Sequence, residues 1–213
     1  MTELGVDYQS LVKHYESCFQ RYGDSHKVVD WPNLKDAQTR YKVMLGLLDG
    51  HVDENEMVRL ADIGCGSGHL LEYIAEHGIT NVEYLGHDLS TIFVKYCRDK
   101  YPDTLFFDGD LLSTDFPLPE FDFAVMNGVF TEKRKLSFED MNIFFQKMLN
   151  CIFQKTKRGM AFNVMSKNVD WERDDLFHLS LDSLTEYLTR QLSKNYIIRN
   201  DYGLYEYTVY VYK

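Results

Sequence analysis

A short apolar run leads directly into three closely spaced glycines near residue 64. Leu60-Ala61-Asp62-Ile63 has the length of a buried strand, Gly64, Gly66 and Gly68 follow it, and helical spacing begins at His69. Glycines at such a turn adopt dihedral angles that other residues resist, and they let the backbone approach a bound nucleotide. The next helix offers free N–H groups and the positive end of its dipole to an anionic group. We therefore expect a strand, a tight turn and a helix that together bind a nucleotide-like ligand.

Short apolar runs alternate with helical segments along most of the chain, a pattern typical of βαβ units and a parallel sheet. The spacing predicts strands at 58–63, 82–87, 104–107, 121–126 and 159–164, with helices at 69–77, 91–100 and 138–154. A helix at 183–192 precedes two β-rich runs, 196–200 and 205–212, which are close enough in sequence to pair antiparallel. The expected sheet has seven strands, is mostly parallel and ends in an antiparallel hairpin.

Two amphipathic helices are expected before the first strand, at about 4–22 and 34–48. In the first, apolar and aromatic residues recur at steps that place them on one helical face: Tyr8, Leu11, Val12, Tyr15, Phe19 and Tyr22. This stripe is most simply a face buried against the sheet. It can also serve as a hydrophobic lid over a binding site.

The composition is that of one acidic, folded domain. The chain has 213 residues, 45% of them hydrophobic, and its formal net charge is −10. A protein of that charge repels phosphate backbones, so nucleic acid is not expected as a partner. There is no apolar run of membrane-spanning length and no secretory signal, so we expect a cytoplasmic protein without a membrane partner. Four widely spaced cysteines without a Cys-x-x-Cys pair disfavour a zinc site and a disulfide framework.

The spacing of the glycines discriminates between kinds of nucleotide-binding loop. A dinucleotide fingerprint requires Gly-x-Gly-x-x-Gly, but the position of its third glycine is His69 here. Asp62, two residues before the first glycine of Gly-x-Gly-x-Gly, resembles the acidic residue in the first motif of class I S-adenosylmethionine (SAM) dependent methyltransferases. The resemblance implies a three-layer, Rossmann-like α/β fold, with SAM as cofactor and S-adenosylhomocysteine (SAH) as product. We expect residues 1–50 to form an N-terminal helical lid or cap and residues 51–213 to form the SAM-binding methyltransferase domain.

Polar residues occur where three further strands are expected to end. Asp88 can accept hydrogen bonds from both ribose hydroxyls. The resemblance places the glycine loop at the methionine end of the cofactor, Asp110 at the adenine amino group, Leu111 over the adenine ring, and Asn127 at the edge next to the transferable methyl. The residues expected to bind the cofactor are Asp62, Gly64, Cys65, Gly66, Gly68, Asp88, Leu89, Asp110, Leu111, Asn127 and Arg40. Arg40 lies on the second predicted helix and would meet the methionine carboxylate, with a solvated helix face as the alternative.

The general base has no motif of its own. Methyl transfer from a sulfonium is an in-line displacement that needs no metal, although a hydroxyl nucleophile benefits from a base within hydrogen-bond reach. The candidates are His14, Asp24, His26, Asp30, His87, Asn127, Glu132, Asn163 and Asp201. Asp24 and His26 are preferred as catalytic residues because they lie in a loop beside the predicted lid.

The acceptor is expected to be a small molecule. The fourth strand does not end in Asn-Pro-Pro-Tyr, so the signature of amino-methylation on a flipped base is missing. Weaker motifs, including Tyr22-Gly23-Asp24-Ser25, look like a bacterial subgroup that acts on small molecules, which suggests oxygen or nitrogen of a sugar or nucleotide-linked sugar. A catalytically silent binding subunit and an NAD-dependent oxidoreductase stay open as alternatives. The sequence does not predict the oligomeric state.

Overall fold

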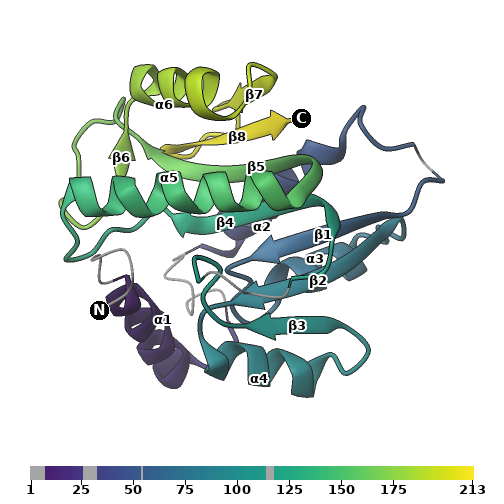
Figure 1. The fold of residues 1–213 in the computed structure, drawn as a ribbon. Helices are drawn as coiled ribbons and strands as arrows, with labels where there is room; N and C mark the ends of the chain where they lie inside the picture. The colour runs from purple at the N-terminus through teal and green to yellow at the C-terminus, as the bar shows by residue number, and fades with distance from the viewer. Residues whose placement is uncertain (1–7, 26–32, 54, 114–117) are drawn as a thin grey trace.

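An eight-stranded sheet forms the centre of the structure, and helices cover both of its faces (Figure 1). The computed structural model describes residues 8–25, 33–53, 55–113 and 118–213. The strands follow the order β3-β2-β1-β4-β5-β8-β7, and β6 pairs with β5 outside this path. Their bounds are β1 Val58–Ile63, β2 Val82–Asp88, β3 Leu105–Asp108, β4 Phe121–Phe130, β5 Thr156–Ser166, β6 His178–Leu179, β7 Tyr196–Arg199 and β8 Glu206–Tyr212.

The parallel strands bring the ends of the predicted motifs to one edge of the sheet. β1 pairs in parallel with β2 on one side and with β4 on the other. β3 continues the sheet beyond β2, and β5 continues it beyond β4, again in parallel. The strand order therefore reverses at β1, and open α/β sheets bind ligands in the crevice outside the carboxyl ends of their strands at such a point.

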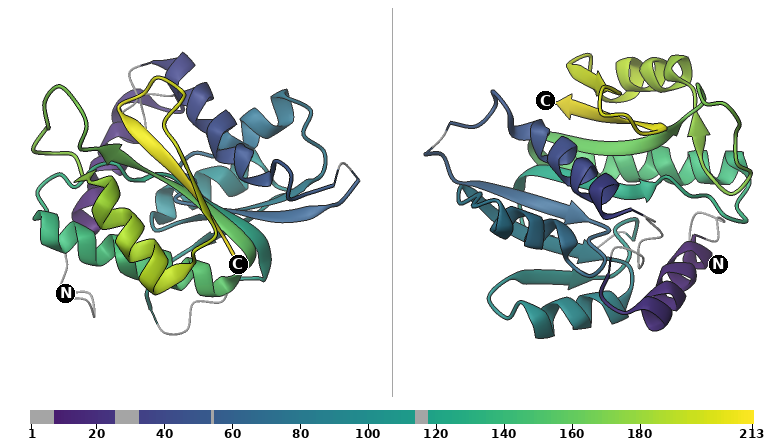
Figure 2. Two further views of the ribbon diagram at one scale, coloured as in Figure 1. Left: turned by 90° about the horizontal axis from the view of Figure 1, so that it is seen from above. Right: turned by 180° about the vertical axis from the view of Figure 1, so that it is seen from behind.

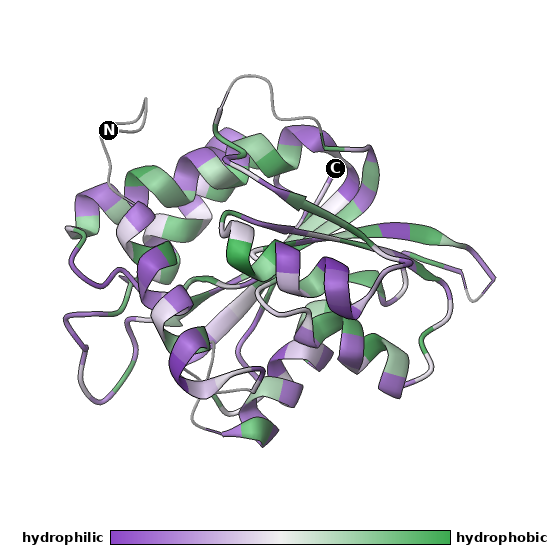
Figure 3. Ribbon diagram, turned by 90° about the horizontal axis from the view of Figure 1, so that it is seen from below, coloured by the Kyte–Doolittle hydropathy of each residue, from purple (hydrophilic) through white to green (hydrophobic). Residues whose placement is uncertain are grey.

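The helices form the outer two of three layers (Figure 2). Their bounds are α1 Gln9–Tyr22, α2 Leu34–Leu45, α3 His69–Glu76, α4 Thr91–Lys100, α5 Phe138–Lys155 and α6 Leu181–Tyr187, with a 3-10 helix η2 at Gly46–Leu48 and a π-helix η3 at Leu188–Leu192. Apolar side chains of α2, α3 and α4 form one core with the sheet, and those of α5 and α6 form the other. Hydrophobic and hydrophilic residues alternate along the helices in step with this packing (Figure 3). Within the described ranges, no helix is both long and apolar enough to cross a membrane.

β8 holds α2 against the sheet. It runs antiparallel between β5 and β7. Glu206, at its start, is buried and receives two hydrogen bonds from the Nε of Arg40 in α2, with a further Nη2 to Oε2 distance of 2.8 Å. The hydroxyls of Tyr210 and Tyr212 donate to backbone carbonyls of α2 and η2.

The predicted α/β class and the predicted order of elements are confirmed, with local differences in the bounds. β4 continues to Phe130, four residues beyond its predicted end, because Gly128, with φ of 84°, accommodates an irregularity in the pairing with β5. β6 was not predicted because a strand of two residues is too short to show an alternation of apolar and polar residues. The first helix begins at Gln9 rather than near residue 4, and residues 1–7 lie outside the described residues.

Candidate functional site

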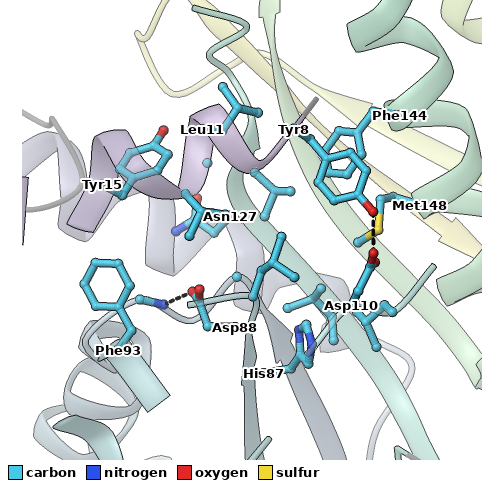
Figure 4. Close-up of a pocket in the computed structure, with 18 of the residues that line it drawn as sticks. Tyr8, Leu11, Tyr15, His87, Asp88, Phe93, Asp110, Asn127, Phe144 and Met148 are labelled. Carbon is cyan, nitrogen blue, oxygen red and sulfur yellow. Dashed lines mark hydrogen bonds between the residues drawn. The ribbon is translucent and has the colours of Figure 1, made fainter. Parts of the chain in front are cut away.

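A pocket lies at the carboxyl ends of β1, β2, β3 and β4 (Figure 4). Its outline contains about 990 Å³ of space, which includes open solvent. α1 covers it on one side, and α5 contributes Phe144 and Met148. Seven predicted cofactor residues line it: Gly64, Gly66, Asp88, Leu89, Asp110, Leu111 and Asn127.

The glycine turn after β1 has the backbone that its sequence predicts. Gly64, Gly66 and Gly68 have φ angles of 78°, 53° and 85°, a region that disfavours side chains. A Cβ on Gly64 would also come within 2.7 Å of Val129 Cγ2. Glycine at position 64 is therefore required both by conformation and by the close approach of β4.

Asp88 links the glycine turn to the end of β2 through hydrogen bonds. One carboxylate oxygen accepts from the backbone N–H of Gly66 at 2.9 Å, and the other accepts from that of Ser90 at 2.8 Å. Burial raises the pKa of Asp88 to about 6, although these two bonds oppose the rise. Carboxylates offer about four acceptor sites, so Asp88 retains capacity for hydroxyl donors in the pocket.

Asp110 occupies the other side of the pocket, after β3. Its Oδ1 accepts from the backbone N–H of Leu112 at 2.9 Å, and its Oδ2 accepts from the hydroxyl of Tyr8 at 2.5 Å (Figure 4). The Tyr8 ring is 2% exposed and stacks on Phe144 with centroids 4.9 Å apart. Tyr8 was expected as part of an apolar stripe, and the structure makes it a polar contact as well.

Asn127 and Glu132 mark the side of the pocket formed by β4 and the loop after it. Asn127 Oδ1 is buried, and among the described residues none donates a hydrogen bond to it. The Glu132 side chain is 12% exposed, and its Oε2 lies 2.5 Å from Nε of Arg134. This wall therefore presents an amide oxygen and a cation-paired carboxylate to the pocket.

Three other predicted cofactor residues lie beneath the glycine turn rather than on the pocket wall. Asp62 is buried and accepts from the hydroxyl of Tyr84 at 2.7 Å, and burial raises its pKa to about 7. Cys65 is buried beside Cys97, whose thiol donates to the carbonyl of Gly66 at 3.3 Å. Gly68 packs under Tyr101. These residues shape the turn from behind.

The structure places Asp24, one of the two preferred general-base candidates, away from the pocket. Asp24 does not line the pocket; it lies beyond the glycine turn, where it accepts from His69 at 2.9 Å, from Tyr96 at 2.7 Å and from Lys100. Burial alone would raise its pKa, but the bonds from Lys100 and Tyr96 outweigh it and lower the pKa to about 2. A carboxylate held so strongly in its ionised form is a poor proton acceptor.

Arg40 also has a different partner from the expected one. Its guanidinium is 13% exposed and forms the ion pair with Glu206, and Arg40 is not among the pocket-lining residues. Asn163 Nδ2 donates to the same Glu206, and its Oδ1 accepts from the N–H of Gly128 on the pocket wall. Arg40 thus supports the β4 wall from behind. His26 and Asp30 lie outside the described residues.

Of the remaining candidates for the general base, some line the pocket and others lie away from it. His87 lines the pocket, but its Nε2 donates to the carbonyl of Gly109 at 2.8 Å, and burial lowers its pKa to about 4. Asp201 is held by Arg199 and does not line the pocket. Among the candidates that the structure describes, Asn127 and Glu132 remain on the β4 wall. Within the described residues, no group of three or more His, Cys, Asp or Glu side chains is placed to hold a metal ion.

Several lining residues carry no strand-end motif and were not predicted as cofactor residues. They come from α1 and the residue before it, from α4 and α5, and from β4 and the loop after it: Tyr8, Leu11, Val12, Tyr15, Phe93, Val129, Glu132, Phe144 and Met148. The only signal for the α1 members was their shared helical face, which fits a lid and a buried face equally well.

Comparison with known proteins points to methyltransferases. A family model described as a methyltransferase domain matches residues 60–155, which span the glycine turn and β4. Rv1506c of Mycobacterium tuberculosis (strain ATCC 25618 / H37Rv), a protein provisionally named a methyltransferase, is 29% identical over 154 residues. The match covers 71% of this chain and 91% of that protein.

Solved structures share the fold at low sequence identity. Magnesium protoporphyrin IX methyltransferase (ChlM) from Synechocystis PCC 6803 with bound SAH is 15% identical, with a TM-score of 0.65 over 96% of this chain and 99% of that chain. The same enzyme with bound SAM gives 16% identity and a TM-score of 0.64 over the full length of both chains. These likenesses confirm the Rossmann-like class of the sheet.

Proposed function

We propose that the chain is a class I SAM-dependent methyltransferase, and that its pocket holds SAM and transfers the methyl group to a small molecule bound beside Asn127 and Glu132. The observation that carries the proposal is that one pocket collects the loop glycines, Asp88, Asp110 and Asn127 from four strand ends. When bound, SAM supplies a methyl group on a cationic sulfur for in-line attack by a nucleophile.

The polar groups around the pocket fit this cofactor. Asp88 and Asp110 are acceptors with capacity left over, which suits ribose hydroxyls and an adenine amino group respectively. Leu111 packs beside Asp110 as an apolar cover for a ring. We assign the methionine end to the glycine turn and the transferable methyl to the side of Asn127. Asp62, Cys65 and Gly68 act by shaping the turn.

The charge of the lining favours an acceptor without phosphate or carboxylate groups. Asp88, Asp110 and Glu132 line the pocket, and no lysine or arginine does so among the described residues. An anionic group of the acceptor beside Glu132 would meet like charge, and the nearby Arg134 is already paired with that carboxylate. A neutral or cationic small molecule, such as an unphosphorylated sugar, therefore fits better than a nucleotide-linked sugar.

We assign Glu132 as the general base that accepts the proton of the acceptor molecule. It lines the pocket next to β4, and Arg134 fixes one of its carboxylate oxygens. Asn127 Oδ1 needs a donor, and a hydroxyl or amine of the acceptor can supply one. Asn127 would orient the nucleophile, and Glu132 would accept its hydrogen bond and then its proton.

The lid that we propose is α1 alone. Tyr8, Leu11, Val12 and Tyr15 line the pocket, whereas α2 packs within the body through Arg40 and β8. The Oγ of Ser90 donates to Glu16 of α1 at 2.6 Å, which ties the helix to the strand end that carries Asp88. Covering by α1 would exclude water from the reacting groups. No finding favours the NAD-dependent alternative.

Calorimetric titration of the wild-type protein and of Asp88→Ala with SAM, SAH and NAD tests the proposal. We expect SAM and SAH to bind at micromolar concentration, the variant to lose about tenfold or more in affinity for both, and NAD not to bind. Binding of NAD alone would overturn the proposal. A screen of neutral, cationic and phosphorylated acceptors with radiolabelled SAM then tests the acceptor class, and turnover restricted to phosphorylated compounds would contradict it.

A further inference from the structure

The hydrogen bond between Tyr8 and Asp110 joins two parts of the chain that lie 102 positions apart. Tyr8 precedes α1 and lies outside residues 60–155, which match the methyltransferase family model. Asp110 follows β3 within those residues. The cofactor pocket is therefore completed by a side chain from the N-terminal segment, and that side chain makes a polar contact.

The contact holds the Asp110 carboxylate in one orientation. Leu112 N–H binds Oδ1, and the Tyr8 hydroxyl binds Oδ2 at a length typical of a charge-assisted bond to an ionised carboxylate. Tyr8 cannot easily turn away, because its ring is 2% exposed and stacks on Phe144. Burial, followed by the bond to Asp110, raises the pKa of Tyr8, so its hydroxyl remains a donor at physiological pH.

An oriented carboxylate can distinguish purines by their substituent at position 6. It accepts from an amino group, but it repels a carbonyl oxygen, which is itself an acceptor. Sites built to bind an N–H donor reject analogues that lack it because their polar groups are then left unpaired. The strength of this rejection depends on how firmly the carboxylate is held and how well water is excluded from it.

We propose that Tyr8 is a positioning residue that fixes Asp110 for recognition of a 6-amino purine, so that α1 and its first turn contribute to cofactor specificity as well as covering the pocket. This inference rests on the proposed function, in which Asp110 meets the adenine amino group. It adds a role for a residue that no strand-end motif indicates.

The test compares SAH with S-inosylhomocysteine, in which oxygen replaces the 6-amino group. Calorimetry gives the ratio of the two dissociation constants for the wild type, Tyr8→Phe and the matched control Tyr15→Phe. Tyr15 lies on the same helix and lines the pocket away from Asp110 (Figure 4). A general loosening of the structure weakens both ligands together, whereas loss of Asp110 orientation changes their ratio.

We expect the wild type to prefer SAH by about 100-fold or more. Tyr8→Phe should lower this ratio about fivefold to tenfold while SAH still binds, and Tyr15→Phe should leave it unchanged. An unchanged ratio in Tyr8→Phe with SAH bound overturns the inference and leaves the proposed function intact. Failure of the wild type to bind SAH overturns the proposed function, and this inference with it.

A double-mutant cycle adds a second readout. Asp110→Ala leaves Tyr8 in place but removes the acceptor for both its hydroxyl and the 6-amino group, so the preference for SAH should fall towards one. In that background, Tyr8→Phe should have no further effect on the ratio. An equal effect of Tyr8→Phe with and without Asp110 would show that Tyr8 acts independently of this carboxylate, which contradicts the proposal.

Discussion

Lys100, Tyr96 and His69 hold Asp24 beyond the glycine turn, whereas Arg134 holds Glu132 on the pocket wall. Both are carboxylates with cationic partners, so residue type and charge do not distinguish their roles. Position relative to the strand ends does, because only Glu132 reaches the pocket. A base can therefore be chosen only after the loops that carry the candidates have been placed.

Glu132→Gln is expected to lower the turnover of an identified acceptor by about 100-fold or more, because general bases typically contribute that much. The affinity for SAH should change little, since the residue lies on the acceptor side. Asp24→Asn, the matched carboxylate-to-amide control, should lower thermal stability but leave the pH profile of turnover unchanged. Steady-state kinetics over pH 5–9 decide the matter, and a greater loss of turnover in Asp24→Asn would refute the assignment.

At the scale of elements, the sequence predicted those strands and helices whose ends are marked by local residue types, such as a glycine turn or a capping serine. The helix at 91–100 was placed at the observed bounds, and Ser90 caps it by accepting from the N–H of Phe93. β4 was predicted too short, because Asn127-Gly128 looks like a turn when its pairing with β5 is unknown. Phe144 was missed as a pocket residue, and the polar contact of Tyr8 was not predicted, because helix packing, which no short motif encodes, brings them there.

Gly86 lies where β2 packs closely against its neighbours beneath the glycine turn. A Cβ at this position would come within 2.4 Å of the buried Phe106 ring and 3.1 Å of Cys65 Sγ. We expect Gly86→Ala to lower the free energy of unfolding by about 1–3 kcal/mol through overpacking. Chemical denaturation measures the loss, and Gly86→Ala/Phe106→Leu should recover part of it. No recovery would mean that the ring is not the obstacle.

At the scale of the whole molecule, Asp62, Asp88 and His87 contribute to how stability depends on pH. Burial raises the pKa of Asp62 to about 7 and that of Asp88 to about 6, whereas an unfolded chain titrates aspartate near 3.9. Between about pH 4 and pH 7 these two carboxyls therefore bind more protons in the folded protein than in the unfolded chain, and they lower the free energy of unfolding as the pH rises through this window. His87, whose pKa burial lowers to about 4, offsets part of this effect between about pH 4 and pH 6.5. Asp24, with its lowered pKa, acts in the opposite direction below about pH 4.

Asp62→Asn should remove the larger part of this pH dependence. The amide can still accept from Tyr84, and it carries no charge that must be desolvated. We expect the variant to gain about 1–4 kcal/mol over the wild type at pH 8 and little at pH 4. Urea denaturation at both pH values measures the difference, and an equal effect at the two would show that the Asp62 charge is not its cause.

The ion pair between Arg40 and Glu206 also has a consequence for the order of folding during synthesis. Its partners are 166 residues apart, and β8 must pair with β5 before α2 has the acceptors that hold it. A nascent chain that has not yet emerged as far as residue 206 leaves Arg40 of α2 without its carboxylate partner and the edge of β5 without its antiparallel partner. Such intermediates expose surfaces that chaperones recognise, so the ribosome-bound chain should depend on them until its last strand is released.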